Sequence, residues 1–232
     1  MAICRLLNIS YQRISLRCYY LSDEGNEEPG FIVRPVENAP LQQFCISKAL
    51  TEPEWGYRLQ CWDAYTCSTP EKLLNIIASG AGACPVMLSA LKVLKNRFPA
   101  YCSGLTIWDE QVLKAASLYG PEIKAARVIG YALYPARNGV DLVTDSYIYD
   151  RILKLGCNSL EAPLLKLNVE NIPVNFCTVA ITEAGTAALR EECNTINMNG
   201  FSDWIGGIEL NTASGGIWLR HSDGSIQYTQ NI

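Results

Sequence analysis

The residue types that could carry chemistry gather near the C-terminal end of the chain. In the stretch GFSDWIGGIEL, residues 200–210, Asp203 and Glu209 lie on either side of Trp204. A carboxylate pair supports acid–base catalysis when burial tunes the pKa values of the two carboxyl groups. We expect Asp203 and Glu209 to be the acidic residues best placed to line a pocket, and Trp204 to offer a binding surface. Gly206 and Gly207 are expected to form the turn that leads into a C-terminal β region.

His221, in WLRHSDG, is the only histidine and therefore the only candidate for a histidine base. Ser222 and Asp223 are its neighbours, but adjacent side chains in a strand or turn point apart and rarely form a catalytic triad. The sequence favours a protein without catalytic activity. A hydrolase that uses His221 or the Asp203/Glu209 pair remains an alternative.

The ten cysteines and the glycine-rich stretch SGAGACP do not indicate a cofactor. No two cysteines have CxxC spacing, and zinc sites usually contain such close pairs. Most of the cysteines lie among apolar residues, which predicts reduced thiols in the core. SGAGACP follows a predicted helix and lacks the Gly-Lys-Ser/Thr ending of a phosphate loop. The sequence therefore predicts no metal, no cofactor and a plain connector at SGAGACP.

The charge pattern bears on location and partners. Arginines interrupt the N-terminal twenty residues, so neither a signal peptide nor a membrane span is predicted there. The net charge of −4 gives no general attraction to polyanions such as nucleic acid. We expect a cytoplasmic protein without a membrane partner, and the sequence predicts no particular oligomeric state.

Residues 1–103 are predicted to form an N-terminal part with short strands and a helical subdomain. Residues 14–20 alternate apolar and polar side chains, as a half-buried strand does, and FIVRPV is a second strand candidate after an acidic loop. Four helices are then predicted, in LQQFCISKAL, PEWGYRLQCWDAY, STPEKLLNIIASG and PVMLSALKVLKNRF. In the second of these, Trp55, Leu59 and Trp62 would share one apolar face.

Residues 104–232 are predicted to form a winged-helix-like module with a C-terminal β tail. Three helices are expected in LTIWDEQVLKAASLYG, PEIKAARVIGYAL and TDSYIYDRILKLG, with Thr106 and Thr144 as caps. The strands PLLKLNV and NFCTVAI and the helix TEAGTAALREE follow, which is the element order of a winged helix, a variant of the helix-turn-helix. IGGIEL, GGIWLRH and SIQYTQ would form a small antiparallel meander. The predicted fold class is α+β and helix-rich.

Five stretches occur in a characteristic order: GLTIWDEQVL, DLVTDSYIYDRIL, AITEAGTAAL, NGFSDWIGGIEL and IWLRH. In this order, and preceded by WDAYTCSTPEKLLNIIASG, they resemble the C-terminal region of an uncharacterised family of bacterial proteins of unknown function. The resemblance covers roughly Trp62 to His221 and implies a winged-helix-like fold without implying an activity. Longer family members carry an N-terminal domain that opens with Gly-Asp-Ser, which this sequence lacks. The family also has Asp-Arg before the Trp and His after the Gly-Gly, where this chain has Ser202, Asp203 and Glu209.

Charge decides between DNA and protein as the partner of the predicted module. Residues 106–192 contain eight basic and eleven acidic side chains, which gives a net charge of −3. Phosphate contacts supply most non-specific DNA affinity, and a DNA-reading helix normally carries several Arg, Lys, Asn or Gln residues. The third helix of the module offers only Arg151 and Lys154. A DNA-binding transcriptional regulator is therefore the alternative that charge disfavours.

The favoured interpretation is a macromolecule-binding protein, with another protein as its partner. Tyr147 and Tyr149 on the third helix are expected to be exposed, and with Trp204 they are the first candidate contacts, because aromatic side chains dominate interface energetics. Lys124, Arg127 and Tyr131 would lie along one stripe of the second helix, with Arg137 in the following turn. That stripe could contact an anionic partner.

Overall fold

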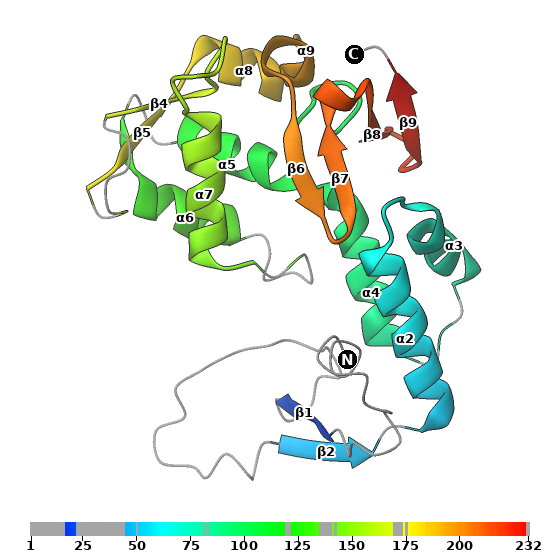
Figure 1. Cartoon of the computed structure of the whole chain (residues 1–232). Coiled ribbons are helices and arrows are strands. Elements are labelled where there is room, and N and C mark those ends of the chain that lie inside the picture. The colour runs from blue at the N-terminus through cyan, green and yellow to red at the C-terminus, as the bar shows by residue number, and fades with distance from the viewer. Residues whose placement is uncertain are drawn as a thin grey trace, which may run out of the picture. The chain divides into compact units, whose positions relative to one another are not determined.

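A computed structural model describes residues 17–21, 45–49, 51–80, 82, 84–118, 122–134, 141, 143–168, 174 and 176–230. The chain is a mixture of helices and strands with small antiparallel sheets (Figure 1). It divides into two compact units, the first formed by Met1–Cys67 with Glu71–Leu91 and the second by Ser68–Pro70 with Lys92–Ile232. None of the helices in the described ranges has the length and apolarity needed to cross a membrane.

In the first unit, strand β1 (Arg17–Leu21) pairs antiparallel with β2 (Cys45–Ala49), with Arg17 opposite Ala49. The predicted strand is therefore confirmed over residues 17–20. The predicted helix in LQQFCISKAL is wrong, because residues 45–49, in its second half, form β2. A helix of ten residues is marginal by itself, whereas pairing with β1 gives the backbone its hydrogen bonds. The strand candidate FIVRPV lies outside the described residues.

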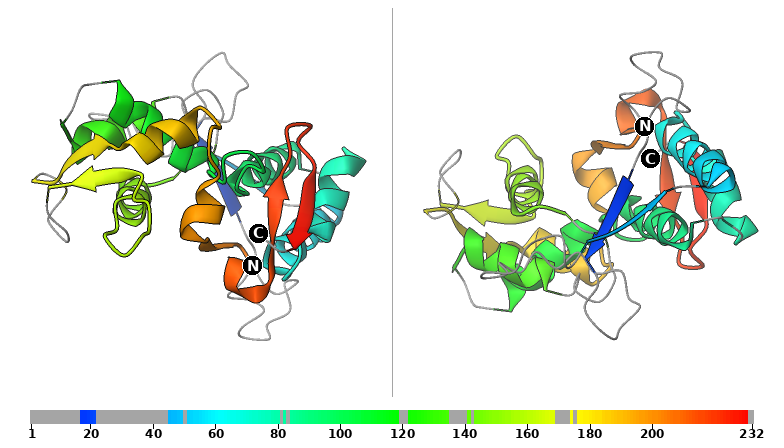
Figure 2. Two further views of the ribbon diagram at one scale, coloured as in Figure 1. Left: turned by 90° about the horizontal axis from the view of Figure 1, so that it is seen from above. Right: turned by 90° about the horizontal axis from the view of Figure 1, so that it is seen from below.

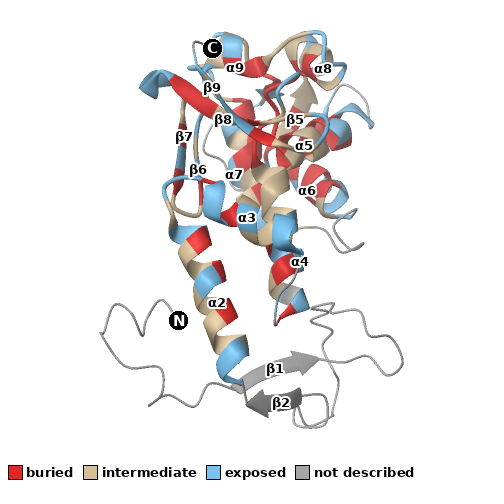
Figure 3. Ribbon diagram, turned by 90° about the vertical axis from the view of Figure 1, so that its right-hand side faces the viewer, coloured by how far each residue is buried: buried red, intermediate tan, exposed pale blue. Residues whose placement is uncertain are grey.

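Helix α2 (Glu52–Thr66) begins with a capping box, in which the Thr51 side chain accepts from the Glu54 N–H and Glu54 binds back to Thr51. Its buried residues recur along one side of the helix, at Tyr57, Cys61 and Ala64 (Figure 3). The predicted face of Trp55, Leu59 and Trp62 is only half-buried, and it is not the most buried side of the helix. Both stripes have i, i+4, i+7 spacing, and a shift of two residues moves a stripe about 200° around the helix.

The remaining helices of this region are α3 (Glu71–Ser79) and α4 (Pro85–Leu94), and the short 3-10 helix η3 (Lys95–Arg97) follows α4. Gly80 has a φ of +60°, the left-handed conformation with which many helices end. SGAGACP thus connects two helices, as predicted from its place in the sequence.

The boundary between the compact units lies earlier than the predicted division at residues 103 and 104. Residues 92–103 belong to the second unit. Backbone hydrogen bonds explain this placement, since Arg220 N–H donates to Pro99 O at 2.9 Å and Tyr101 N–H donates to Arg220 O at 2.9 Å. Phe98, fully buried, anchors the same segment.

The described part of the second unit includes the α-helices α5 (Ile107–Ser117), α6 (Ala125–Leu133), α7 (Asp145–Leu155), α8 (Glu183–Leu189) and α9 (Thr195–Asn199). The predicted caps are confirmed, because Thr106 forms a capping box with Asp109 and the Thr144 side chain accepts from the Tyr147 N–H. The short helix α9 was not predicted. Helices α5, α6 and α7 share one core, in which Trp108, Val112 and Ile148 are fully buried.

A three-stranded antiparallel sheet belongs to the same core. Strands β3 (Ile123–Lys124), β5 (Thr178–Ile181) and β4 (Leu165–Leu167) lie side by side in that order. In Figure 2, where α7 is seen nearly end-on, β4 and β5 extend to one side of it and the C-terminal strands lie on the other.

The predicted helix in PEIKAARVIGYAL is wrong at its start, because residues 123 and 124 form β3 and α6 begins at Ala125. Ile123 pairs with Val179, and Ala125 N–H donates to Cys177 O at 2.9 Å. A strand of two residues leaves no periodic signal in sequence, so only its distant partner reveals it.

The C-terminal strands form two hairpins: β6 (Ser202–Ile205) pairs with β7 (Ile208–Asn211), and β8 (Gly216–Arg220) pairs with β9 (Ile226–Gln230). The predicted single meander is therefore wrong, since β7 and β8 are not hydrogen-bonded to each other. IGGIEL is not one strand but contains the turn between β6 and β7, where Gly206 has a φ of +60°.

Among the described cysteines, Cys61, Cys84 and Cys177 are buried, three are half-buried and Cys102 is exposed. Burial is the main cause that raises the pKa of the Cys61 and Cys177 thiols, so their reactive thiolate forms are disfavoured. At pH 8 we expect iodoacetamide to alkylate Cys102 rapidly and to leave Cys61 and Cys177 protected until the chain unfolds. Peptide mass spectrometry measures each rate, and equal rates at Cys102 and Cys177 would contradict the described burial.

Candidate binding cleft

The most buried charged pair in the described chain joins α7 to the start of α5. The Arg151 guanidinium makes a bidentate contact with the Asp109 carboxylate, from Nε to Oδ1 at 2.8 Å and from Nη2 to Oδ2 at 2.7 Å. The two residues are 4% and 2% exposed. Asp109 Oδ2 also accepts from the N–H and hydroxyl of Thr106, at 3.0 and 2.6 Å. The capping box therefore orients the carboxylate that holds Arg151.

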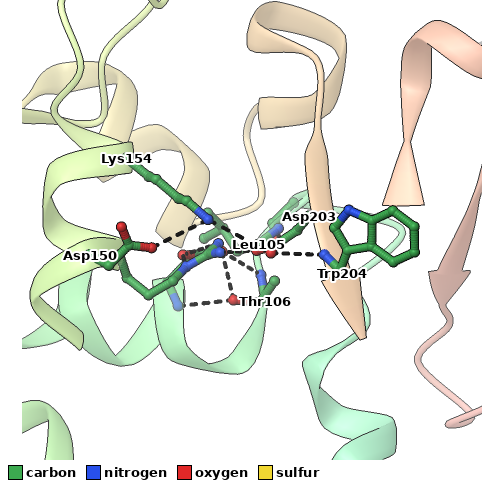
Figure 4. A network of polar contacts seen from close by, with 9 residues as sticks. Leu105, Thr106, Asp150, Lys154, Asp203 and Trp204 are labelled. Carbon is green, nitrogen blue, oxygen red and sulfur yellow. Dashed lines mark hydrogen bonds and ion pairs between the residues drawn. The ribbon is translucent and has the colours of Figure 1, made fainter. Parts of the chain in front are cut away.

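Asp203 of β6 completes this network from the other side (Figure 4). Arg151 Nη1 donates to Asp203 Oδ2, and Lys154 Nζ lies 3.7 Å from Asp203 Oδ1 and 3.3 Å from Asp150 Oδ2. The paired carboxylates favour the charged form of Arg151 and raise its pKa, although its desolvation alone would lower it. The link from Arg151 to Asp203 ties the hairpin β6–β7 to α7.

A cleft of about 700 Å³ opens beside this network, with Arg151 and Asp203 among its lining residues. Its walls come from the second half of α7, the segment after it, α9 and the start of β6. Leucines and Phe201 line much of the cleft. Its charged residues are two cations and two anions, namely Arg151, Lys154, Asp109 and Asp203. These four side chains are committed to one another, so the cleft is suited to an uncharged, largely apolar ligand or segment.

Trp204 and Glu209 lie on the opposite face of the hairpin from Asp203. They are direct cross-strand partners, whereas Asp203 is opposite the buried Leu210. Successive side chains of a strand point to opposite faces. The indole in Figure 4 accordingly extends away from the ion pairs, and Trp204 is 61% exposed. Asp203 lines a cleft, but Glu209 does not join it there.

Tyr147 and Tyr149 are half-buried against the core, so the prediction that they are exposed is wrong. Burial is the largest cause that raises the pKa of both phenols. The Arg97 guanidinium lies 5.5 Å from the centroid of the Tyr147 ring. Arg97 Nη2 also donates to Asp141 at 2.8 Å. Tyr147 therefore belongs to a packed polar cluster rather than to an open surface.

The cationic stripe predicted for the second helix is divided between two elements. Arg127 and Tyr131 are exposed on α6, with the guanidinium 5.8 Å from the centroid of the ring. Lys124 is exposed in β3. Arg137 lies outside the described residues.

His221 lies just after β8, with its ring stacked on Tyr101 at a centroid distance of 4.6 Å. Its Nε2 atom is buried and has no hydrogen-bond partner within the part of the chain that the structure describes. Among the described residues, no nucleophile is thus hydrogen-bonded to that nitrogen. The described residues also contain no group of three or more His, Cys, Asp or Glu side chains that could hold a metal ion.

Sequence reasoning named Arg151 and Asp203 but did not connect them, and it did not name Asp109 as a site residue. Asp109 and Arg151 are 42 positions apart, and Arg151 and Asp203 are 52 apart. No local pattern marks such pairs. Comparison with known proteins adds no family to this geometry, since no protein-family model and no curated protein matches the chain.

Proposed function

We propose that residues 104–232 contain a winged helix that binds another protein and has no catalytic role. The order α5, β3, α6, α7, β4, β5 supports this proposal, together with a sheet in which β3 pairs with β5 of the β4–β5 hairpin. In this assignment α6 and α7 form the helix-turn-helix, and α7 takes the place of the recognition helix. We also propose that residues 62–221 are related to the bacterial family of unknown function that they resemble.

One observation favours a protein partner over DNA: the only arginine of α7 is withdrawn from the surface. Arg151 is bound to Asp109 and Asp203, while Asp145 and Asp150 are exposed on the same helix. Lys154 lies within 4 Å of two carboxylates. A helix of this charge would repel DNA phosphates instead of neutralising them. Trp204, mostly exposed on β6, is the contact that we assign to the partner protein.

The proposal predicts that the full chain does not retard a duplex of about 30 base pairs at about 50 mM salt, where electrostatic binding is strong. The matched variant carries Asp145→Lys and Asp150→Lys, which reverse the charge of the exposed helix. Mobility shift assays with both proteins measure the effect. DNA binding by the variant alone would identify the acidic face as the cause. Micromolar binding by the wild type that weakens steeply with salt would instead establish the DNA-binding alternative.

The positive half of the proposal is tested by affinity capture from the source cell. The wild-type protein should capture a specific partner protein. The Trp204→Ala variant should capture much less of that partner, although its second unit stays folded. A partner that is retained equally by both proteins would remove Trp204 from the interface.

A further inference from the structure

Helix α6 exposes an aromatic and cationic surface that the cleft and the Trp204 hairpin do not use. Arg127, Tyr131 and Tyr134 follow one another at i, i+4 and i+7, so they lie along one side of the helix and its last turn. Tyr134 is 68% exposed and Tyr131 is 36% exposed. The small residues Ala126 and Gly130 are also exposed and lie beside this row. A Cβ atom added to Gly130 would meet nothing within 4 Å.

The surface continues onto the edge of the three-stranded sheet. Lys124 is opposite Thr178 in the β3–β5 pair, and Phe176, two residues before Thr178, is 70% exposed. A cavity of about 470 Å³ lies at the junction of β3 and α6, lined by residues that include Lys124 and Arg127. We call Lys124, Arg127, Tyr131, Tyr134 and Phe176 the α6 face.

The charge of this face is opposite to that of the module around it. Its two charged members are cations, although residues 106–192 carry a net charge of −3. Glu122, which also lines the cavity, is an exposed carboxylate that accepts a hydrogen bond from the Thr178 hydroxyl at 2.5 Å, so the cavity lining carries two cations and one anion. A partner complementary to the face therefore needs a small excess of negative charge close to apolar side chains.

We propose that the α6 face docks an acidic amphipathic helical segment of another protein. The apolar side of such a segment would pack on the tyrosines and Phe176, and its carboxylates would meet Lys124 and Arg127. This inference rests on the proposed protein-binding function and names the chemistry of a partner for it.

Charge and symmetry argue against two other occupants. A nucleic acid extends well beyond the face, and its phosphates would meet the negative remainder of the module within a Debye length of about 10 Å. A second copy that paired α6 with α6 would bring Lys124 and Arg127 toward the same cations of its partner, because a twofold interface places the same patch on both sides. A short acidic helix avoids both costs.

Phage display of random 16-residue peptides against the immobilised full chain tests this proposal. Retained peptides should be enriched in Asp and Glu and should carry apolar residues at helical spacing. Fluorescence anisotropy with one synthetic selected peptide should then show affinity about tenfold weaker for Tyr134→Ala and for Arg127→Ala. Tyr228→Ala and Arg190→Ala are matched controls on β9 and after α8, and they should leave the affinity unchanged.

Each other outcome overturns the inference. Peptides without acidic enrichment, or no retained peptides, would refute the assigned chemistry. Acidic peptides that depend on Trp204 instead of Tyr134 would refute the assigned face and leave the proposed protein-binding function standing. A duplex DNA that binds the wild type and loses affinity in Arg127→Ala would refute both, because the face would then serve nucleic acid.

Discussion

Replacing Arg151 by methionine is expected to lower the free energy of unfolding of the second unit by about 3–5 kcal/mol. The substitution keeps much of the side-chain volume but leaves the buried Asp109 carboxylate without its cation. Removing one member of a buried ion pair typically has a cost of this size. The protection of the Cys177 thiol against alkylation in increasing urea measures the unfolding of this unit, because Cys177 is fully buried in its core.

Lys154→Met is the matched control, since it removes a cation from the same helix at a side chain that is 48% exposed. An exposed ion pair contributes at most about 1 kcal/mol, so this variant should be nearly as stable as the wild type. Asp109→Asn combined with Arg151→Met should be less harmful than the sum of the two single variants, because it removes both charges. Equal, small losses for Arg151→Met and Lys154→Met would show that the Arg151 pair does not stabilise the fold.

Trp108→Ala is expected to destabilise the same unit by about 3–5 kcal/mol, because it empties the largest fully buried side-chain position in the described core. The indole N–H donates to Asp141 Oδ2 at 3.0 Å, so the substitution also removes a donor from a carboxylate that is bound to Arg97. Urea unfolding followed by Cys177 protection gives the difference in free energy. The loss of soluble protein on expression would agree in direction, and Trp108→Phe would then supply a smaller, measurable decrease.

Trp204→Ala makes the same chemical change at a tryptophan that is 61% exposed. Surface substitutions of this kind usually stay within about 0.5 kcal/mol. The stability of Trp204→Ala should therefore match that of the wild type, which keeps this variant usable in the partner-capture experiment. A large loss would mean that Trp204 packs against the fold and is no free contact surface.

Local features of the fold were accessible from sequence where a short-range interaction decides them. The caps Thr106 and Thr144 each bind a backbone N–H three residues ahead, so residue type and spacing were sufficient to place the starts of α5 and α7. On α7 the apolar residues Ile148, Ile152 and Leu155 form the buried stripe, and no second apolar stripe on that helix competes with it. On α2 two apolar stripes share the same period, and periodicity could not choose between them.

Burial was the step at which sequence reasoning about the candidate site failed most often. Tyr147 and Tyr149 were assigned to the surface although they pack on the core, and Arg151 was considered a surface cation although it lies in the interior. A titratable or aromatic side chain on a helix gives no sign of its environment. That environment is set by elements that arrive many residues later in the chain, as β6 does for Arg151.

The sequence by itself determined helices α5, α7 and α8, the caps Thr106 and Thr144, strands β4, β5, β8 and β9, the acidic balance of the module and the glycine turn after Trp204. These follow from interactions over a few residues and from composition. Only the tertiary structure decided that Asp203 meets Arg151, that Glu209 faces away, and that Lys124 lies in a strand beside α6. The reason is physical: a charge paired across 42 or 52 positions, or a strand of two residues, is specified by its distant partner and not by its neighbours.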